Sequence, residues 1–330
     1  DYRSSRGLGD VYKRQAVDMS MEHILTLFET SELMYWVGVF ALFNITLVVI
    51  ETLVDLFSKK RRSWRDTLSN VAIFFLGELT ERFLHGALGV LALLPIYLFL
   101  PYEIPMNWWT WCLALLAADF TYYWMHRLEH EHRILWASHS VHHSSEDYNL
   151  TVSFRLSIVE GLFEWAFLIP MIVAGFNPFQ AIMALIFVVQ YQTWIHTEHI
   201  GKLGWLDEVF NTPSVHRVHH GSNRKYLDKN YGGVLMIWDK LFGTFQREEE
   251  KVKYGLTRNI NTYNPIKINF VEYGNIWKDV RQCRTFSDKM KIIFGNLVWK
   301  PTYFKKNKND YGNFINEQSW KLFGFGSQGD

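Results

Sequence analysis

The sequence predicts an all-α protein: a multi-span membrane helix bundle, made of an N-terminal span and two hairpins, with a helical cap on its cytosolic side. Three observations predict this fold, namely long apolar stretches, basic residues that alternate between the linking segments, and histidines clustered where the stretches end. About 20 apolar residues in a helix are needed to cross the hydrocarbon core of a bilayer. Aromatic residues make up 17% of the chain, which suits a protein with long membrane interfaces, where Trp and Tyr rings settle.

Five apolar stretches are candidate spans. They are residues 34–57, 71–100, 107–125, 156–176 and 178–195. The turn signal Asn177-Pro178 separates the last two. The second stretch is too long for one perpendicular span and carries polar residues at helical spacing in its first half: Glu78, Glu81, Arg82 and His85. Charged groups at membrane depth normally face the protein interior and pair, so we interpret these four as a polar seam near the functional site.

The basic residues predict the orientation, because cytosolic loops carry the excess of Lys and Arg. Residues 16–57 contain neither, residues 59–65 contain five, and the loop at 101–106 contains none. Bases return from Arg127 onward and again after residue 201. This alternation predicts an outside N-terminus and a cytosolic C-terminal half, in a bacterial inner membrane or an ER-type membrane. A soluble protein with buried core helices is the alternative. The net charge of +1 gives no sign of a nucleic-acid partner.

The chain divides by composition into three parts. Residues 10–15 resemble the translated end of a transposon used to prepare sequencing libraries, so residues 1–15 are expected to be an artefact, the alternative being a genuine disordered N-terminus. Residues 16–245 are expected to form the membrane and histidine-rich catalytic domain. Residues 246–330 are polar and charged, and are expected to form a cytosolic C-terminal extension.

Eleven of the 13 histidines lie between His126 and His220, and three groups of them have metal-ligand spacing. The groups are His126 with His130, His139 with His142 and His143, and His216 with His219 and His220. Residues three or four apart share one face of a helix, so each group can point at one place. For the third group, Thr212 suits an N-cap, Pro213 the first helical position and Gly221 the exit, which predicts a helix of about two turns.

Eight histidines in three spaced groups favour metal binding over eight separate core histidines. Packed imidazoles without a metal leave donors and acceptors unsatisfied at a dry interface, and charging them would crowd like charges. Neutral imidazole is a good ligand for Fe, Cu, Ni or Zn. Eight nitrogens exceed what one ion takes, so two ions are predicted. Cys112 and Cys283 lie far apart in the sequence, so the prediction depends on histidine alone.

The same residues carry a family resemblance. The pattern HxxxH, HxxHH, HxxHH across paired hairpins resembles the fatty acid hydroxylase and sterol desaturase superfamily of membrane di-iron enzymes. Further motifs resemble the alkylglycerol monooxygenases within it, over roughly residues 35–270. These motifs are His142-His143-Ser-Ser-Glu-Asp-Tyr-Asn149, Tyr191-Gln-Thr-Trp-Ile-His196-Thr-Glu, His216-Arg-Val-His219-His220-Gly, Asp228-Lys-Asn-Tyr-Gly-Gly and Trp238-Asp-Lys-Leu-Phe-Gly-Thr-Phe.

The resemblance implies that the eight histidines of the three groups are iron ligands. His196 lies in a matching motif and is added to them; His199, three residues later, could share its face and is a further candidate. His132 points off the face of His126 and His130, and is expected in an outer or surface position. Asp119 is two turns before His126 and is expected to orient a ligand through its spare N–H. Glu131 is expected to do the same or to bind a pterin-like donor. For both carboxylates a purely structural role is the alternative.

The implied function is that of a membrane-bound di-iron oxygenase that uses O2 to hydroxylate a lipid C–H bond, next to the ether oxygen of an alkylglycerol. The implied electron donor is external, either tetrahydrobiopterin or a ferredoxin-type protein, because the chain has no nucleotide fingerprint or haem-attachment motif. Two alternatives stay open. One is a sterol, hopanoid or fatty acyl hydroxylase or desaturase of the same superfamily. The other is a histidine-rich zinc or nickel membrane transporter or storage protein.

Overall fold

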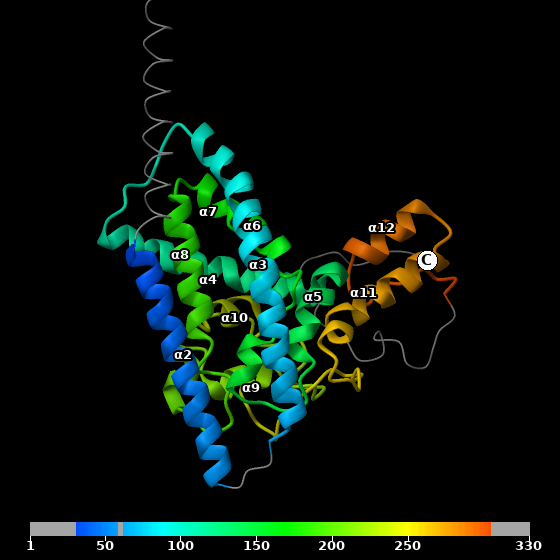
Figure 1. Ribbon diagram of the computed structural model, residues 1–330. Helices are drawn as coiled ribbons and strands as arrows, with labels where there is room; N and C mark the ends of the chain where they lie inside the picture. Colours follow the sequence, from blue (N-terminus) through cyan, green and yellow to red (C-terminus); the bar gives the residue numbers. More distant parts are fainter. Residues whose placement is uncertain (1–30, 59–61, 305–330) are drawn as a thin grey trace, which may run out of the picture.

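The computed structural model describes residues 31–58 and 62–304 (Figure 1). These residues form helices and two isolated bridges but no strand, which confirms the all-α prediction. His23 and the expected artefact at residues 1–15 lie outside the described residues. So do the side chains of Glu81, Arg82 and His85, hence the polar seam stays a prediction.

Two long helices open the fold. Helix α2 covers Ser31–Phe57 and α3 covers Trp64–Phe99, with the side chain of Ser63 capping the start of α3. Helix α8 (Pro178–Tyr191) lies between them in Figure 1, and Asn44 of α2 donates a 2.6 Å hydrogen bond to Gln190 at the end of α8. The 36 residues of α3 extend about 54 Å, more than a bilayer core of about 30 Å requires. A helix of this length would have to tilt within such a layer or extend beyond it.

The third predicted stretch lies within α4, which covers Trp108–Glu131. Asn107 and Thr110 form a capping box at its start, and Asn177 caps α8 in front of Pro178. Helices α4 and α8 pack closely on one another through small residues of a shared core: Ala114, Ala118, Ala181 and Ala184. Small side chains let helix backbones approach. This contact brings α4, which carries His126 and His130, next to α8, which precedes His196 in the chain.

The expected span at 156–176 is interrupted. It consists of a linking segment, α6 (Gly161–Phe167) and α7 (Ile169–Val173), and the short helix η1 (Leu150–Phe154) precedes it. Pro170 lies in the first turn of α7; it has no backbone N–H and cannot continue the preceding helix. By length and composition, one helix among the described residues, over Gly38–Phe57, is long and apolar enough to cross a membrane. The multi-span arrangement therefore stays a prediction.

Six further helices complete the part of the chain that the structure describes. They are α5 (Arg133–His143), η2 (Gly204–Glu208), α9 (Pro213–His219), α10 (Ile237–Phe242), α11 (Pro265–Gln282) and α12 (Phe286–Phe294). Helices α11 and α12 stand beside the bundle in Figure 1 and pack on α5. Ile276 and Ile292 share a core with Ala137, and Ile268 shares another with Ile73 and Val141. The described part of the C-terminal extension is thus joined to the histidine-bearing helices by apolar cores.

Candidate metal centre

Nine buried histidines come together from four segments and form two groups (both among the described residues). The first group is His126, His130, His139, His143 and His219; the second group is His142, His196, His216 and His220. In each group the ligand atoms all lie within 4.8 Å of one another. The eight histidines of the three predicted boxes and His196 are all brought together here, and each of α5 and α9 contributes to both groups.

Local structure explains this division. His126 and His130 lie one turn apart at the end of α4, and His139 and His143 one turn apart on α5, so each pair shares a face. His142 lies on another face of α5 and joins the second group. Helix α9 is seven residues long with Pro213 in its first turn, as predicted. Thr212 precedes it, but its hydroxyl bonds the Asp207 carboxylate and not the helix backbone.

Backbone carbonyls fix the orientation of three rings. The Nδ1 atom of His126 lies 3.0 Å from the carbonyl oxygen of Tyr231, that of His196 lies 2.7 Å from Gln192, and that of His219 lies 2.9 Å from Lys229. A carbonyl oxygen only accepts, so each Nδ1 must carry the proton and donate it. The Nε2 atom of each ring is then left with a lone pair for a metal.

The ring nitrogens face one another within both groups. In the first group, the distances between Nε2 atoms are 3.0 Å for His126–His139, 3.1 Å for His139–His143 and 3.1 Å for His143–His219. In the second group, they are 3.2 Å for His142–His196 and 2.9 Å for His196–His216. Metal–nitrogen bonds of about 2.1 Å hold adjacent ligands about 3.0 Å apart at right angles. The spacing therefore fits a metal between the rings.

Protonation does not remove the need for a cation. Burial lowers the pKa of His196 to about 4 and that of His219 to about 3. Burial, reinforced by the neighbouring imidazoles, also holds the pKa of His130 and His142 well below the ordinary histidine value. These four rings are thus neutral near pH 7. His130 Nε2, His142 Nδ1 and His220 Nε2 are also buried without a hydrogen-bond partner, which a metal ion would supply. The residues present fit two metal ions, each with a nitrogen-rich set of ligands.

Two buried glutamates behind His139 were missed by the sequence analysis. His139 Nδ1 lies 3.1 Å from Glu160 Oε1 and 3.4 Å from Glu129 Oε2. A carboxylate that receives the spare N–H of a metal-ligating histidine fixes the ring and makes it a better ligand. Burial, with Glu160 nearby, raises the pKa of Glu129 well above its usual range. The signal available in the sequence was Glu160 itself, an acid at the edge of an apolar stretch.

The two predicted carboxylates lie elsewhere. The Asp119 carboxylate accepts hydrogen bonds from Val234 N at 2.7 Å, Leu235 N at 3.2 Å and Trp238 Nε1 at 2.9 Å. The expected contact with a ligand ring is made instead by the Tyr231 carbonyl, which belongs to the segment that Asp119 holds. Glu131 pairs with Arg127, at 2.8 Å between Oε1 and Nε.

Two further histidines lie outside both groups. His199 Nε2 is 2.7 Å from Asp55 Oδ1, so the structure does not bring this candidate ligand to the other nine. His132 is half-buried and its Nδ1 lies 2.9 Å from the Phe294 carbonyl, in the outer position that its spacing predicts.

A pocket opens onto both groups. His130, His143 and His219 of the first group and His220 of the second line it. The rest of its wall is mostly apolar or backbone: Trp136, Gly221, Ser222, Leu227, Asp228, Gly255, Leu256, Thr257 and Leu297. Leu297 reaches the pocket because its N–H donates to the Glu131 carbonyl at 2.9 Å, which ties the C-terminal extension to the end of α4.

The part of the chain that carries the nine histidines is similar to known proteins. Residues 111–244, from α4 to the segment after α10, match the fatty acid hydroxylase family model. The human alkylglycerol monooxygenase is 43% identical over 266 residues, which are 78% of this chain and 59% of that protein. The Xenopus tropicalis alkylglycerol monooxygenase is 47% identical over 202 residues, 61% of this chain and 44% of that protein. An ornithine lipid hydroxylase of Rhizobium tropici is 35% identical over 153 residues, 44% of each chain.

The matches do not extend over the whole of these relatives. The aligned part spans about half the length of the curated proteins named above, between 44% and 59%. No solved structure matches the chain.

Proposed function

We propose, on the premise that this chain belongs to the fatty acid hydroxylase family through residues 111–244, that it is a non-haem di-iron monooxygenase that hydroxylates a C–H bond of a membrane lipid. The substrate that we propose is an alkylglycerol ether, because the alkylglycerol monooxygenases of Homo sapiens and Xenopus tropicalis are 43% and 47% identical to it. O2 is the oxidant in this proposal.

The observation that carries the proposal is the division of nine buried histidines into two groups with facing nitrogens. Each group offers enough neutral imidazole for one ion. Iron held there would supply the redox chemistry that activates O2 for attack on a C–H bond, which zinc cannot supply because it has no redox chemistry.

In this proposal, other residues of the chain orient the histidine rings and line the pocket that binds the lipid. The carbonyls of Tyr231, Gln192 and Lys229 keep three rings in the ligating tautomer. The pocket offers Leu256, Leu297 and the Trp136 ring, against which an alkyl chain can pack next to the histidines. Apolar walls suit a substrate that reacts at an unactivated carbon.

The proposed setting is a membrane, with the histidines at the cytosolic side. Gly38–Phe57 within α2 has the length and composition of a span, and the other predicted spans would make the protein multi-pass. The basic residues favour a cytosolic position for both histidine groups. The electron donor is proposed to be external, either tetrahydrobiopterin or a ferredoxin-type protein.

Iron analysis and lipid oxidation test the proposal together. Detergent-purified protein should contain about two irons per chain, and reduced protein supplied with O2 should release an aldehyde from an alkylglycerol. A double variant, His142→Ala with His219→Ala, removes one ring from each group and should lose both iron and activity. Zinc alone, retained after anaerobic purification with added iron, would reject the oxygenase and favour a zinc transporter or storage protein. Activity on a sterol or an acyl lipid, but on no ether, would correct the substrate.

A further inference from the structure

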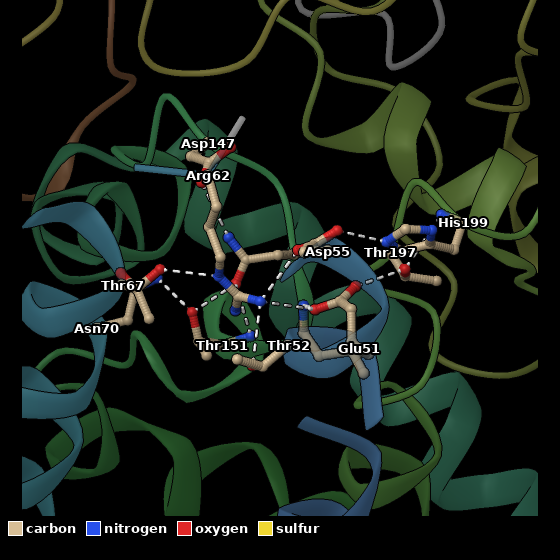
Figure 2. Close-up of polar contacts among 12 residues, drawn as sticks. Glu51, Thr52, Asp55, Arg62, Thr67, Asn70, Asp147, Thr151, Thr197 and His199 are labelled. Atoms are coloured by element: carbon tan, nitrogen blue, oxygen red, sulfur yellow. Dashed lines mark hydrogen bonds and ion pairs between the residues drawn. The ribbon is translucent and has the colours of Figure 1, made fainter. Parts of the chain in front are cut away.

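A buried charged network joins α2 to the second histidine group. Glu51 and Asp55, one turn apart on α2, are 5% and 4% exposed, and Arg62 follows α2 in the chain. Figure 2 shows the Arg62 guanidinium lying between the two carboxylates and the segment that follows α5. Charges are costly in a helix of span length unless they are paired, so their presence in α2 requires a role.

The Glu51 carboxylate bridges two loops that carry ligands. Its Oε2 accepts the Leu150 N–H at 2.8 Å, and its Oε1 accepts the Thr197 hydroxyl at 2.6 Å. Leu150 lies in the segment that follows His142 and His143, and Thr197 directly follows His196. His142 and His196 are neighbours in the second group, with 3.2 Å between their Nε2 atoms.

Arg62 and Asp55 strengthen the same bridge. Arg62 donates to Asp55 Oδ2 at 3.1 Å and to Asn149 Oδ1 at 2.7 Å, beside Leu150. Asp55 Oδ1 lies 2.7 Å from His199 Nε2, two residues beyond Thr197. Each loop therefore has two contacts with α2 and the residues that follow it. One contact is made by Glu51, and the other is made by Arg62 for the first loop and by Asp55 for the second.

The first histidine group has no such bridge among the described contacts of Glu51 and Asp55. Its rings are oriented by Glu160 and by the carbonyls of Tyr231 and Lys229, which lie in other segments. Of the two loops that Glu51 holds, the one at Thr197 therefore follows a ligand of the second group alone, whereas the one at Leu150 follows α5, which carries ligands of both groups.

We infer that Glu51 is a positioning residue for the second metal ion: it holds the loops of His142 and His196 at ligating distance, and so makes occupancy of that group depend on α2. This inference rests on the proposed two-iron centre. It differs from a general stabilising role because it predicts the loss of one ion of two.

The substitution Thr197→Val tests the inference. It removes the hydroxyl group that donates a hydrogen bond to Glu51, and it changes the shape of the side chain little. The affinity for one of the two irons should fall roughly 10- to 100-fold, as is typical when an outer partner of a metal ligand is removed. A chelator titration of the iron-loaded full-length protein measures both affinities, and Mössbauer spectra of the same samples follow the two iron environments. Thr197→Ser keeps the hydroxyl and should retain both irons.

Thr52→Val is the matched control. Thr52 accepts a 3.1 Å hydrogen bond from Arg62 but touches neither ligand-bearing loop in these contacts, so both irons should remain. Equal iron affinities in Thr197→Val and in the unaltered protein would overturn the inference. An equal loss of affinity for both irons, together with a lower unfolding temperature, would overturn it as well. A serine variant that loses iron like the valine variant would overturn it too. Fewer than two irons in the unaltered protein would instead reject the proposed function.

Discussion

The Nε2 atoms of His126 and His139 lie 3.0 Å apart, although the Nδ1 atom of each ring already faces an oxygen, of Tyr231 and of Glu160 respectively. Two nitrogen lone pairs therefore face one another in a buried position. Burial keeps the pKa of His126 well below the ordinary value, so this ring does not take up a proton near pH 7 that would relieve the repulsion. A cation between the rings would relieve it.

Metal removal should destabilise the protein. An ion that binds the folded chain alone stabilises it by mass action, by about 4 kcal/mol when the free ion is at about 1,000 times its dissociation constant. We expect the unfolding temperature, measured by tryptophan fluorescence in detergent without oxygen, to fall after chelation and to recover when iron returns. An unfolding temperature that is indifferent to both treatments would contradict the metal centre.

Two neighbouring histidines should differ in their effect on iron. His130 is buried in the first group with its Nε2 atom unpartnered, whereas His132 is half-buried, lies outside both groups and contacts a carbonyl of the C-terminal extension. His130→Ala should lower the iron content and His132→Ala should not. Elemental analysis of the two proteins, purified in parallel, provides the measurement. Equal iron contents in the two variants would contradict the assignment of His130 as a metal ligand.

Gly233→Ala should disturb the segment that orients His126. A Cβ atom at Gly233 would lie 2.5 Å from Val188 Cγ1 and 2.9 Å from Tyr122 Cδ1. Such overpacking costs about 1–3 kcal/mol, and the strain falls next to the Asp119 carboxylate that holds Val234. Val188→Ala removes the closest atom, so the double variant should regain part of the lost stability. Chemical denaturation of the single and double variants measures this; a double variant less stable than Gly233→Ala would contradict the packing.

Asp239 should make stability depend on pH. Its carboxylate is buried and accepts the N–H groups of Tyr231 and Gly232, and burial raises its pKa from 3.8 to about 6. Because the folded pKa lies above the unfolded one, this group contributes stability that is fully present below about pH 3.8 and is lost as the pH rises through about 6. The shift corresponds to about 3 kcal/mol.

The control for this prediction is Asp239→Asn, which cannot ionise. Free energies of unfolding at pH 7 and pH 5 should show that the unaltered protein gains stability relative to the variant as the pH falls. A difference between the two proteins that stays constant with pH would place the pKa of Asp239 near its ordinary value.

The sequence by itself determined the local features. Asn107, Asn177-Pro178 and Pro213 begin helices in the structure as their residue types predict, because capping and the proline ring act within one turn. The spacing of His126 with His130 was sufficient to place both on one helix face, since a helix repeats every 3.6 residues. The expectation that each later box points at one place was wrong, because each of these boxes is divided between the two groups.

Only the tertiary structure decided which faces meet. The packing of α4 on α8 and of α5 on α11 divides nine histidines between two groups, includes His196 and leaves His199 beside Asp55. It also brings Glu160 to His139 and Glu51 to Thr197, across 21 and 146 residues of sequence. No local pattern could predict these pairs, because contacts between distant segments depend on how whole helices pack and not on the spacing within any one of them.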